Sequence, residues 1–166
     1  MRNITTYSEL ESALMQSIIQ GMHSLGDKTK ATLISMTRTK FYYAHKPELY
    51  KRTQEVLKSI TVLYKSKSKN TYEFTVFFDK TKIQARNSTF RLPIGMQRFH
   101  HHKSLSGENV AEYMAEMMNY GNRSSRYSYP GAYFYEATKA ALYSNKKHLE
   151  IIAKQFKKVG LKTSFI

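Results

Sequence analysis

The residues best suited to chemistry in this sequence are the cations between Asp79 and Glu108. That stretch holds lysines, arginines and three consecutive histidines but no carboxylate. Its charged and titratable residues are Lys80, Lys82, Arg86, Arg91, Arg98, His100, His101, His102 and Lys103. Grouped cations of this kind bind phosphate oxygens or the carboxylates of an acidic protein surface. We therefore expect a contact with nucleic acid or with a neighbouring subunit here.

The backbone of this stretch is predicted to be extended. Pro93 and Gly95 interrupt any long helix, and the residues around them are short polar, aromatic or β-branched types. So long a connection in a compact domain is usually functional when it has no secondary structure of its own. We call residues 80–105 the basic arm and predict a β-hairpin within it, Ser88–Leu92 against Gln97–His101.

Neither a metal site nor catalysis is expected from these residues. Adjacent residues of an extended chain point to opposite faces, so three consecutive histidines do not converge on one ion. The chain has no cysteine to complete a ligand set. Arg98 and His100 are residue types that metal-independent ribonucleases use, but acid–base catalysis needs a positioned acid, a positioned base and a pocket. We expect no enzyme activity, metal or cofactor.

The composition favours a folded and strongly basic protein. Of its 166 residues 41% are hydrophobic, and 27 Lys plus Arg against 12 Asp plus Glu give a formal net charge of +15. Self-repulsion at this charge weakens a compact monomer and favours polyanions or acidic proteins as neighbours. The 13 tyrosines suit subunit interfaces, because their rings are apolar and their hydroxyls polar. No apolar run approaches the ~20 residues of a membrane span, so we expect synthesis in the cytosol and no membrane partner.

A long amphipathic helix is predicted near the N-terminus. Thr6 and Ser8 are each followed three residues later by Glu, which offers two alternative capping boxes. Apolar residues then recur at helical spacing, so the helix is expected to extend to about Thr39. Gly21 and Gly26 weaken it and are points at which it can bend.

A β-hairpin is predicted in the middle of the chain, after a short helix over Glu48–Lys58 that follows Pro47. Its strands are Ile60–Tyr64 and Thr71–Phe78, where apolar and polar residues alternate.

Further helices are predicted from Ser106 to Gly121 and from Phe134 to Phe156, and Ser144-Asn145 can split the second. The predicted fold class is α+β, with a long N-terminal helix and C-terminal helices packed on a small antiparallel sheet. We expect a single domain, residues 1–166, from which the basic arm extends.

Two local signatures accompany this order of elements. The first is Tyr43-x-His45-x-Pro47-x-x-Tyr50-x-Arg52-Thr53, leading to Ser59 and the hairpin. The second is Met117-Met118-Asn119-Tyr120-Gly121, followed after a loop by Tyr133–Thr138. From Leu10 to Gly160, the chain resembles the neck or tail-completion proteins of tailed bacteriophages, which join the head connector to the tail tube. The residues that carry the resemblance are Pro47, Tyr50, Arg52, Thr53, Ser59, Tyr120, Gly121 and Phe134.

The resemblance implies a ring-forming virion protein without catalytic residues. Its partners would be identical subunits, the adjacent connector, and tail-tube or tail-terminator proteins. It would assemble in the host cytoplasm and reside in the virion neck, where a basic lumen would contact packaged DNA nonspecifically. The basic arm has no counterpart in the shorter members of that family. Composition alone leaves open an alternative, a basic nucleic-acid-binding module.

Overall fold

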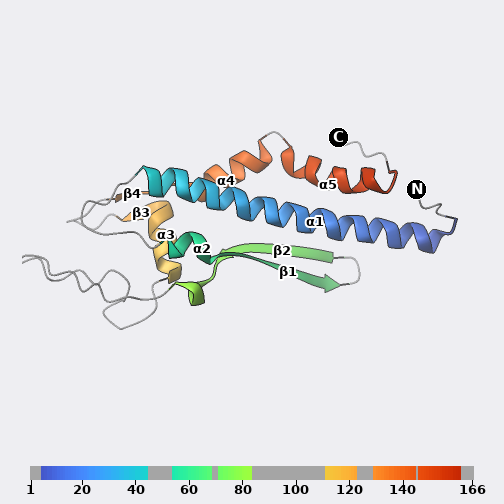
Figure 1. The fold of residues 1–166 in the computed structure, drawn as a ribbon, viewed down its shortest axis with the longest axis horizontal. Helices are drawn as coiled ribbons and strands as arrows, with labels where there is room; N and C mark the ends of the chain where they lie inside the picture. The colour runs from blue at the N-terminus through green and yellow to red at the C-terminus, as the bar shows by residue number, and fades with distance from the viewer. Residues whose placement is uncertain are drawn as a thin grey trace, which may run out of the picture. The chain divides into compact units, whose positions relative to one another are not determined.

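The computed structural model describes residues 5–44, 54–68, 71–83, 111–122, 129–144 and 146–161. The fold is α+β, with a long N-terminal helix, C-terminal helices and a small two-stranded antiparallel sheet (Figure 1), as predicted. The predicted hairpin of the basic arm, Ser88–Leu92 with Gln97–His101, lies outside the described residues, as does the first part of the predicted helix Glu48–Lys58.

Helix α1 (Tyr7–Thr37) begins at a capping box formed by Thr6 and Glu9. The Glu9 backbone N–H donates to Thr6 Oγ1 at 3.2 Å, and the Thr6 N–H donates to Glu9 Oε2 at 3.1 Å. The pKa of Glu9 is lowered, most strongly by the hydrogen bond from the Thr5 backbone N–H and next by the hydrogen bond from the Thr5 hydroxyl. The earlier of the two predicted boxes is therefore the one used.

Helix α1 is continuous (Figure 1), and its range includes Gly21 and Gly26. Each of these glycines allows a side chain of another element to approach the helix closely. A Cβ at Gly21 would lie 3.3 Å from Ile152 Cγ2, and one at Gly26 would lie 2.7 Å from the Tyr64 hydroxyl. The glycines are thus packing positions on the helix.

At its end, α1 continues into a π-helix, η1 (Arg38–Tyr43), which the sequence pattern did not predict.

The predicted central hairpin is confirmed, and its first strand is longer than expected. Helix α2 (Glu55–Ser59) leads directly into β1 (Ile60–Ser68), which pairs with β2 (Thr71–Phe78). On β2, Phe78 is buried whereas its neighbour Phe77 is exposed. This alternation follows the two-residue period of a strand. The 3₁₀-helix η2 (Lys80–Lys82) follows and begins the basic arm.

The described residues from 111 onward form three helices. Helix α3 (Ala111–Tyr120) ends at Gly121, whose φ of 87° is a left-handed conformation that suits glycine. The short strands β3 (Gly121–Asn122) and β4 (Tyr129–Pro130) pair antiparallel. Helices α4 (Phe134–Tyr143) and α5 (Lys147–Lys158) are separate, so the predicted split at Ser144-Asn145 is confirmed.

The chain divides into two compact units, and each has its own buried residues. The first unit comprises residues 1–35, 62–76 and 135–166, and the second comprises residues 36–61 and 77–134. Buried apolar side chains of the first unit are Leu25, Leu33, Leu142 and Ala153. Those of the second are Val56, Leu57, Ile60, Phe78, Ile83, Ala115, Met118 and Phe134.

Candidate functional site

The described residues include the beginning of the basic arm but not most of its cations. Lys80 and Lys82 form part of η2, whereas Arg86, Arg91, Arg98 and Lys103 lie outside the described residues, together with the three histidines. Of the residues that carry the phage-neck resemblance, Pro47, Tyr50, Arg52 and Thr53 also lie outside. Ser59, Tyr120, Gly121 and Phe134 are described and belong to the second unit.

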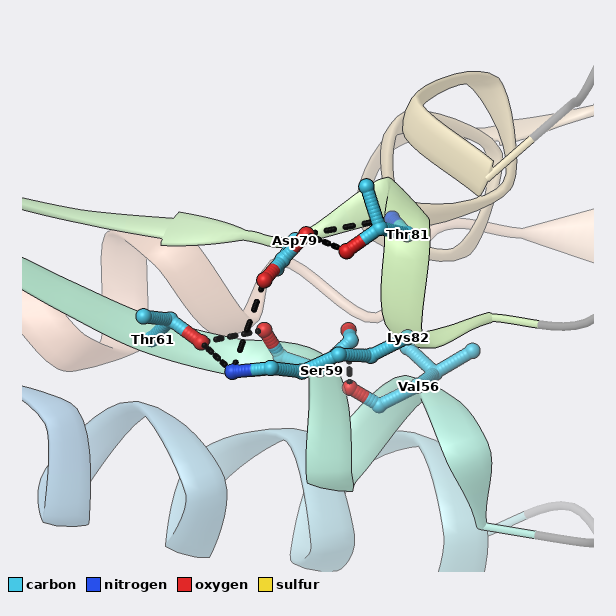
Figure 2. Close-up of polar contacts among 6 residues, drawn as sticks. All are labelled: Val56, Ser59, Thr61, Asp79, Thr81 and Lys82. Carbon is cyan, nitrogen blue, oxygen red and sulfur yellow. Dashed lines mark hydrogen bonds and ion pairs between the residues drawn. The ribbon is translucent and has the colours of Figure 1, made fainter.

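The arm begins at a cluster of polar side chains that we call the arm root: Ser59, Thr61, Asp79, Thr81 and Lys82 (Figure 2). The Asp79 backbone N–H donates to the Ser59 carbonyl at 2.9 Å, which joins the end of β2 to the start of β1. The Ser59 side chain is fully buried, and its hydroxyl donates to the Val56 carbonyl at 2.7 Å. Ser59 therefore ties α2 to the base of the hairpin.

The Asp79 carboxylate organises η2 by accepting hydrogen bonds from Thr81. Asp79 Oδ1 lies 2.6 Å from the Thr81 hydroxyl and 3.1 Å from the Thr81 backbone nitrogen (Figure 2). The hydrogen bond from the Thr81 hydroxyl is the largest cause of a lowered pKa of Asp79, and the nearby Lys82 ammonium adds to it. The carboxylate therefore stays ionised at neutral pH.

Lys82 is directed back onto the hairpin (Figure 2). Its ammonium donates to Thr61 Oγ1 at 2.7 Å and lies 3.4 Å from Asp79 Oδ2. The Thr61 hydroxyl in turn donates to the Ser59 carbonyl at 3.1 Å. Lys82 was predicted as a contact to DNA or to another subunit, and this stays a prediction; within the described residues, Lys82 holds η2 against the start of β1.

The described neck-like residues divide between core and surface. Phe134 is fully buried and lies against Phe78, with ring centroids 6.0 Å apart, whereas Tyr120 is 56% exposed. The backbone N–H groups of Ala132 and Tyr133 donate to carbonyls at the end of α3. Sequence reasoning missed Gly131, where any Cβ would overlap the backbone of that helix end.

A second polar cluster, also missed from the sequence, lies in the first unit where the hairpin packs on α1. The rings of His23 and Tyr64 stack with centroids 4.0 Å apart. The Tyr64 hydroxyl lies 2.9 Å from both the His23 carbonyl oxygen and Asp27 Oδ1. Burial and the hydrogen bond to Asp27 raise the pKa of Tyr64 to about 12. Tyr64 is 41 positions from His23 and 37 positions from Asp27 in the sequence, so no local pattern signals the cluster.

On its other side, His23 lines a shallow groove of about 450 Å³ between α1 and α5. The groove residues are Ile19, Gln20, His23, Ser24, Gln155 and Lys158. Gln155 Nε2 donates to Ser24 Oγ at 3.0 Å and so joins the two helices across the groove.

Two features are absent from the described residues. No helix there is long and apolar enough to cross a membrane. No group of three or more His, Cys, Asp or Glu side chains there could hold a metal ion.

These features define an α+β protein with a strong positive charge and exposed tyrosines. The model of the YomN family matches residues 6–158, so the chain belongs to the YomN family. This family is phage-derived and indicates a phage-associated protein, in agreement with the phage part of the sequence resemblance. No curated protein and no solved structure matches the chain.

Proposed function

We propose that this chain is a structural virion protein of the bacteriophage head–tail junction. Copies of it form an oligomeric ring that joins the head connector to the tail and lines the DNA channel, without catalysis. The ring's neighbours are the connector and the tail-tube or tail-terminator proteins. Membership of a phage-derived family supports the viral setting of this proposal.

The observation that carries the proposal is the exposure of large tyrosine rings on both units. Tyr7 is 82% exposed and Tyr43 is 68% exposed. Tyr120, Tyr133 and Tyr143 are also more than half exposed. Tyrosine is enriched at protein interfaces, because it buries a large rigid ring and keeps a hydroxyl for hydrogen bonding. Contact with further copies of the chain would cover these rings.

The basic arm supplies a second kind of subunit contact in this proposal. An extended segment can lie on the next subunit of a ring or pair with the edge of its sheet. Its cations Arg86, Arg91, Arg98 and Lys103 then face either an acidic surface of that subunit or the DNA. The arm root anchors the first residues of the arm, Lys80–Lys82, to the base of the hairpin.

Cryo-electron microscopy of the phage particle, with this chain carrying an epitope tag, tests the proposal. We expect a ring of tagged copies between head and tail. A stop codon in the gene should leave filled heads and unjoined tails, and the wild-type chain supplied from a plasmid should restore joined particles. Particles that lack the chain, or joined particles in the stop-codon mutant, would contradict the proposal.

The role of the exposed rings is tested in the same complementation experiment. Tyr7→Ser with Tyr43→Ser should fail to restore joined particles, because contacts between copies lose two rings. Lys139→Ser, a change at an exposed residue of α4, is the matched control and should restore them. Equal restoration by both would show that these two rings are not assembly contacts.

A basic nucleic-acid-binding module is the alternative that the net charge of +15 favours. It predicts a protein absent from the particle, with a nucleic-acid affinity that falls steeply as salt rises. Replacing Arg86, Arg91 and Arg98 by Ala separates the two functions. If the chain is a nucleic-acid-binding module, this variant should lose nucleic-acid affinity. If the arm instead contacts a neighbouring subunit in the ring, the variant should keep that affinity and fail in particle assembly.

A further inference from the structure

The outer face of α5 carries a row of lysines. With about 100° of rotation per residue, Lys147, Lys154 and Lys158 lie within about 40° of one another around the helix axis. All three are exposed, whereas Ala153 is buried and Phe156 on the opposite side is half-buried; the exposed Glu150 borders the row. The row extends over about 16 Å of helix length. The segment α4–α5 contains six lysines and two glutamates, a net charge of 6 − 2 = +4.

The groove beside this row is lined by Ile19 and by polar or cationic side chains, and no carboxylate is among them. Lys158 belongs to both features, because it lies in the row and lines the groove. Gln155 uses one N–H on Ser24 Oγ, which leaves its second N–H and the Ser24 hydroxyl proton available to an incoming acceptor. Asp27, one turn further along α1, is the acceptor for the Tyr64 hydroxyl. The groove therefore suits an anionic oxygen.

The types of these residues favour phosphate over an acidic protein surface. Lysine is depleted at protein–protein interfaces, where arginine supplies the bidentate contacts to carboxylates. Neither α1 nor α5 contains an arginine. Lysine, serine and glutamine side chains, in contrast, are common donors to the phosphates of DNA. The spacing of charges along a duplex also lets a row of about 16 Å meet several phosphates.

We propose that the α5 face made by Lys147, Lys154 and Lys158, with the adjoining groove, binds the phosphate backbone of duplex DNA without reading its sequence. One phosphate sits in the groove against Lys158, Ser24 and Gln155, and the row of lysines follows the strand. This deepens the proposed function and rests on it, because it names the surface that faces DNA in the channel. It differs from the sequence-based expectation, which named the basic arm as the contact to DNA or to a neighbouring subunit.

The test is fluorescence anisotropy of a labelled duplex with the full-length chain, over a series of salt concentrations. Lys147→Gln, Lys154→Gln and Lys158→Gln are combined in one variant. The matched control is Lys40→Gln, Lys58→Gln and Lys65→Gln, three exposed lysines elsewhere with the same loss of charge. Light scattering and circular dichroism first establish that both variants have the wild-type mass and helix content.

We expect the α5 variant to lose at least about tenfold in affinity at 0.1 M salt. The slope of the logarithm of the binding constant against the logarithm of salt concentration should decrease in magnitude by about 2.7, since each neutralised phosphate contributes about 0.9. The control should keep the wild-type slope. Ser24→Ala with Gln155→Ala should weaken binding and leave the slope unchanged, because neutral donors release no counterions.

Three results would overturn this inference. The first is an equal loss in the α5 variant and the control, which reports net charge alone. The second is no duplex binding by the wild type at low salt. The third is displacement of the duplex by polyglutamate at the same charge concentration as competitor DNA, which assigns the face to an acidic protein. If the ring is absent from particles while the α5 variant still loses DNA affinity, the proposed function fails and the binding surface stands.

Discussion

At the scale of single residues, Thr37 stands out because its buried hydroxyl has no hydrogen-bond partner among the residues that the structure describes. The side chain is fully buried at the last position of α1, where the π-helix η1 follows. A buried hydroxyl that loses water without gaining a protein partner costs free energy. The buried hydroxyl of Thr37 therefore carries a local energetic cost.

Replacing Thr37 with the isosteric valine should raise the free energy of unfolding by about 1 kcal/mol, because the buried methyl loses no hydrogen bond. Urea denaturation followed by circular dichroism measures the change. Thr32→Val is the control, since the Thr32 hydroxyl donates to the Lys28 carbonyl at 2.8 Å, and it should bring no gain. A Thr37→Val protein no more stable than wild type would show that the hydroxyl has a partner in solution.

Tyr64→Phe should lower the free energy of unfolding by about 1 kcal/mol at pH 7, because the bond to Asp27 and the His23 carbonyl is lost. Since the folded pKa is raised from 10.0 to about 12, the contribution is fully present below pH 10 and is lost as pH rises through 12. The difference between wild type and variant should therefore narrow from pH 10 upward. A difference independent of pH in that range would contradict the assigned hydrogen bond.

Asp79→Ala should loosen η2, since Thr81 loses both of its hydrogen bonds to the carboxylate. Because the folded pKa is lowered from 3.8, this contribution is present above that value and is lost as pH falls through the lower folded pKa. Hydrogen exchange should show reduced protection of the Thr81 amide at neutral pH. Asp79→Asn keeps an acceptor oxygen and should reduce protection less; equal effects would assign the contribution to charge alone.

At the scale of elements, the two glycines of α1 determine how closely its neighbours approach. At Gly26, a methyl group would meet the Tyr64 ring, which cannot move without losing its stacking on His23. At Gly21, the nearest atom is a methyl group of Ile152, which can shift by a few tenths of an ångström.

Gly26→Ala should destabilise the protein by about 1–3 kcal/mol, because the overlap exceeds the gain in helix propensity of about 1 kcal/mol. Gly21→Ala is its matched control. Its free energy of unfolding should lie within about 1 kcal/mol of the wild-type value, since the same gain in helix propensity offsets the weaker overlap with Ile152. Free energies of unfolding from urea titrations of both variants check the difference. A Gly26→Ala protein at least as stable as Gly21→Ala would contradict the close packing of Tyr64 on α1.

Elements whose signals are local in sequence could be predicted, and contacts between distant segments could not. The capping box at Thr6, the alternation in β2 and the break between α4 and α5 depend on neighbouring residues. The stacking of His23 on Tyr64 and the contact at Gly131 depend on segments brought together by folding. The glycines of α1 illustrate the difference, because helix propensity marks them only as weak points, whereas packing shows why a larger side chain does not fit there.

The same distinction holds for the candidate site. Charge counting pointed to the basic arm, whose cations are adjacent in sequence. It did not predict that Lys82 would be held by Thr61, or that Lys158 would share a groove with residues of α1, because both depend on chain reversals. Short sequence motifs were enough to predict a phage protein, and the family match supports that prediction.

At the scale of the whole molecule, the formal charge of +15 dominates the electrostatics. Like charges repel within a compact chain, and dissolved salt screens that repulsion over about 10 Å at 0.1 M. Stability should therefore depend on ionic strength more than it does for a neutral domain.

The thermal midpoint should rise by several degrees between 0.05 and 0.5 M sodium chloride, and micromolar polyphosphate should raise it at low salt, because a ligand that binds the folded state stabilises it. Differential scanning calorimetry measures both effects. Sucrose at matched osmolality is the control for solvent effects that do not involve charge. A thermal midpoint that stays constant or falls as salt rises would show that repulsion between like charges does not limit the stability of the fold.

The hydrogen bond from Asp79 to Ser59 closes the hairpin at its open end and has a mechanical consequence. Tension applied to the chain beyond Ile83 reaches this bond and the Lys82–Thr61 contact before it reaches the paired strands. Because the buried Ser59 is also bonded to α2, we expect part of this load to pass to that helix. A segment attached in this way can be pulled by a neighbouring molecule while the hairpin keeps its register.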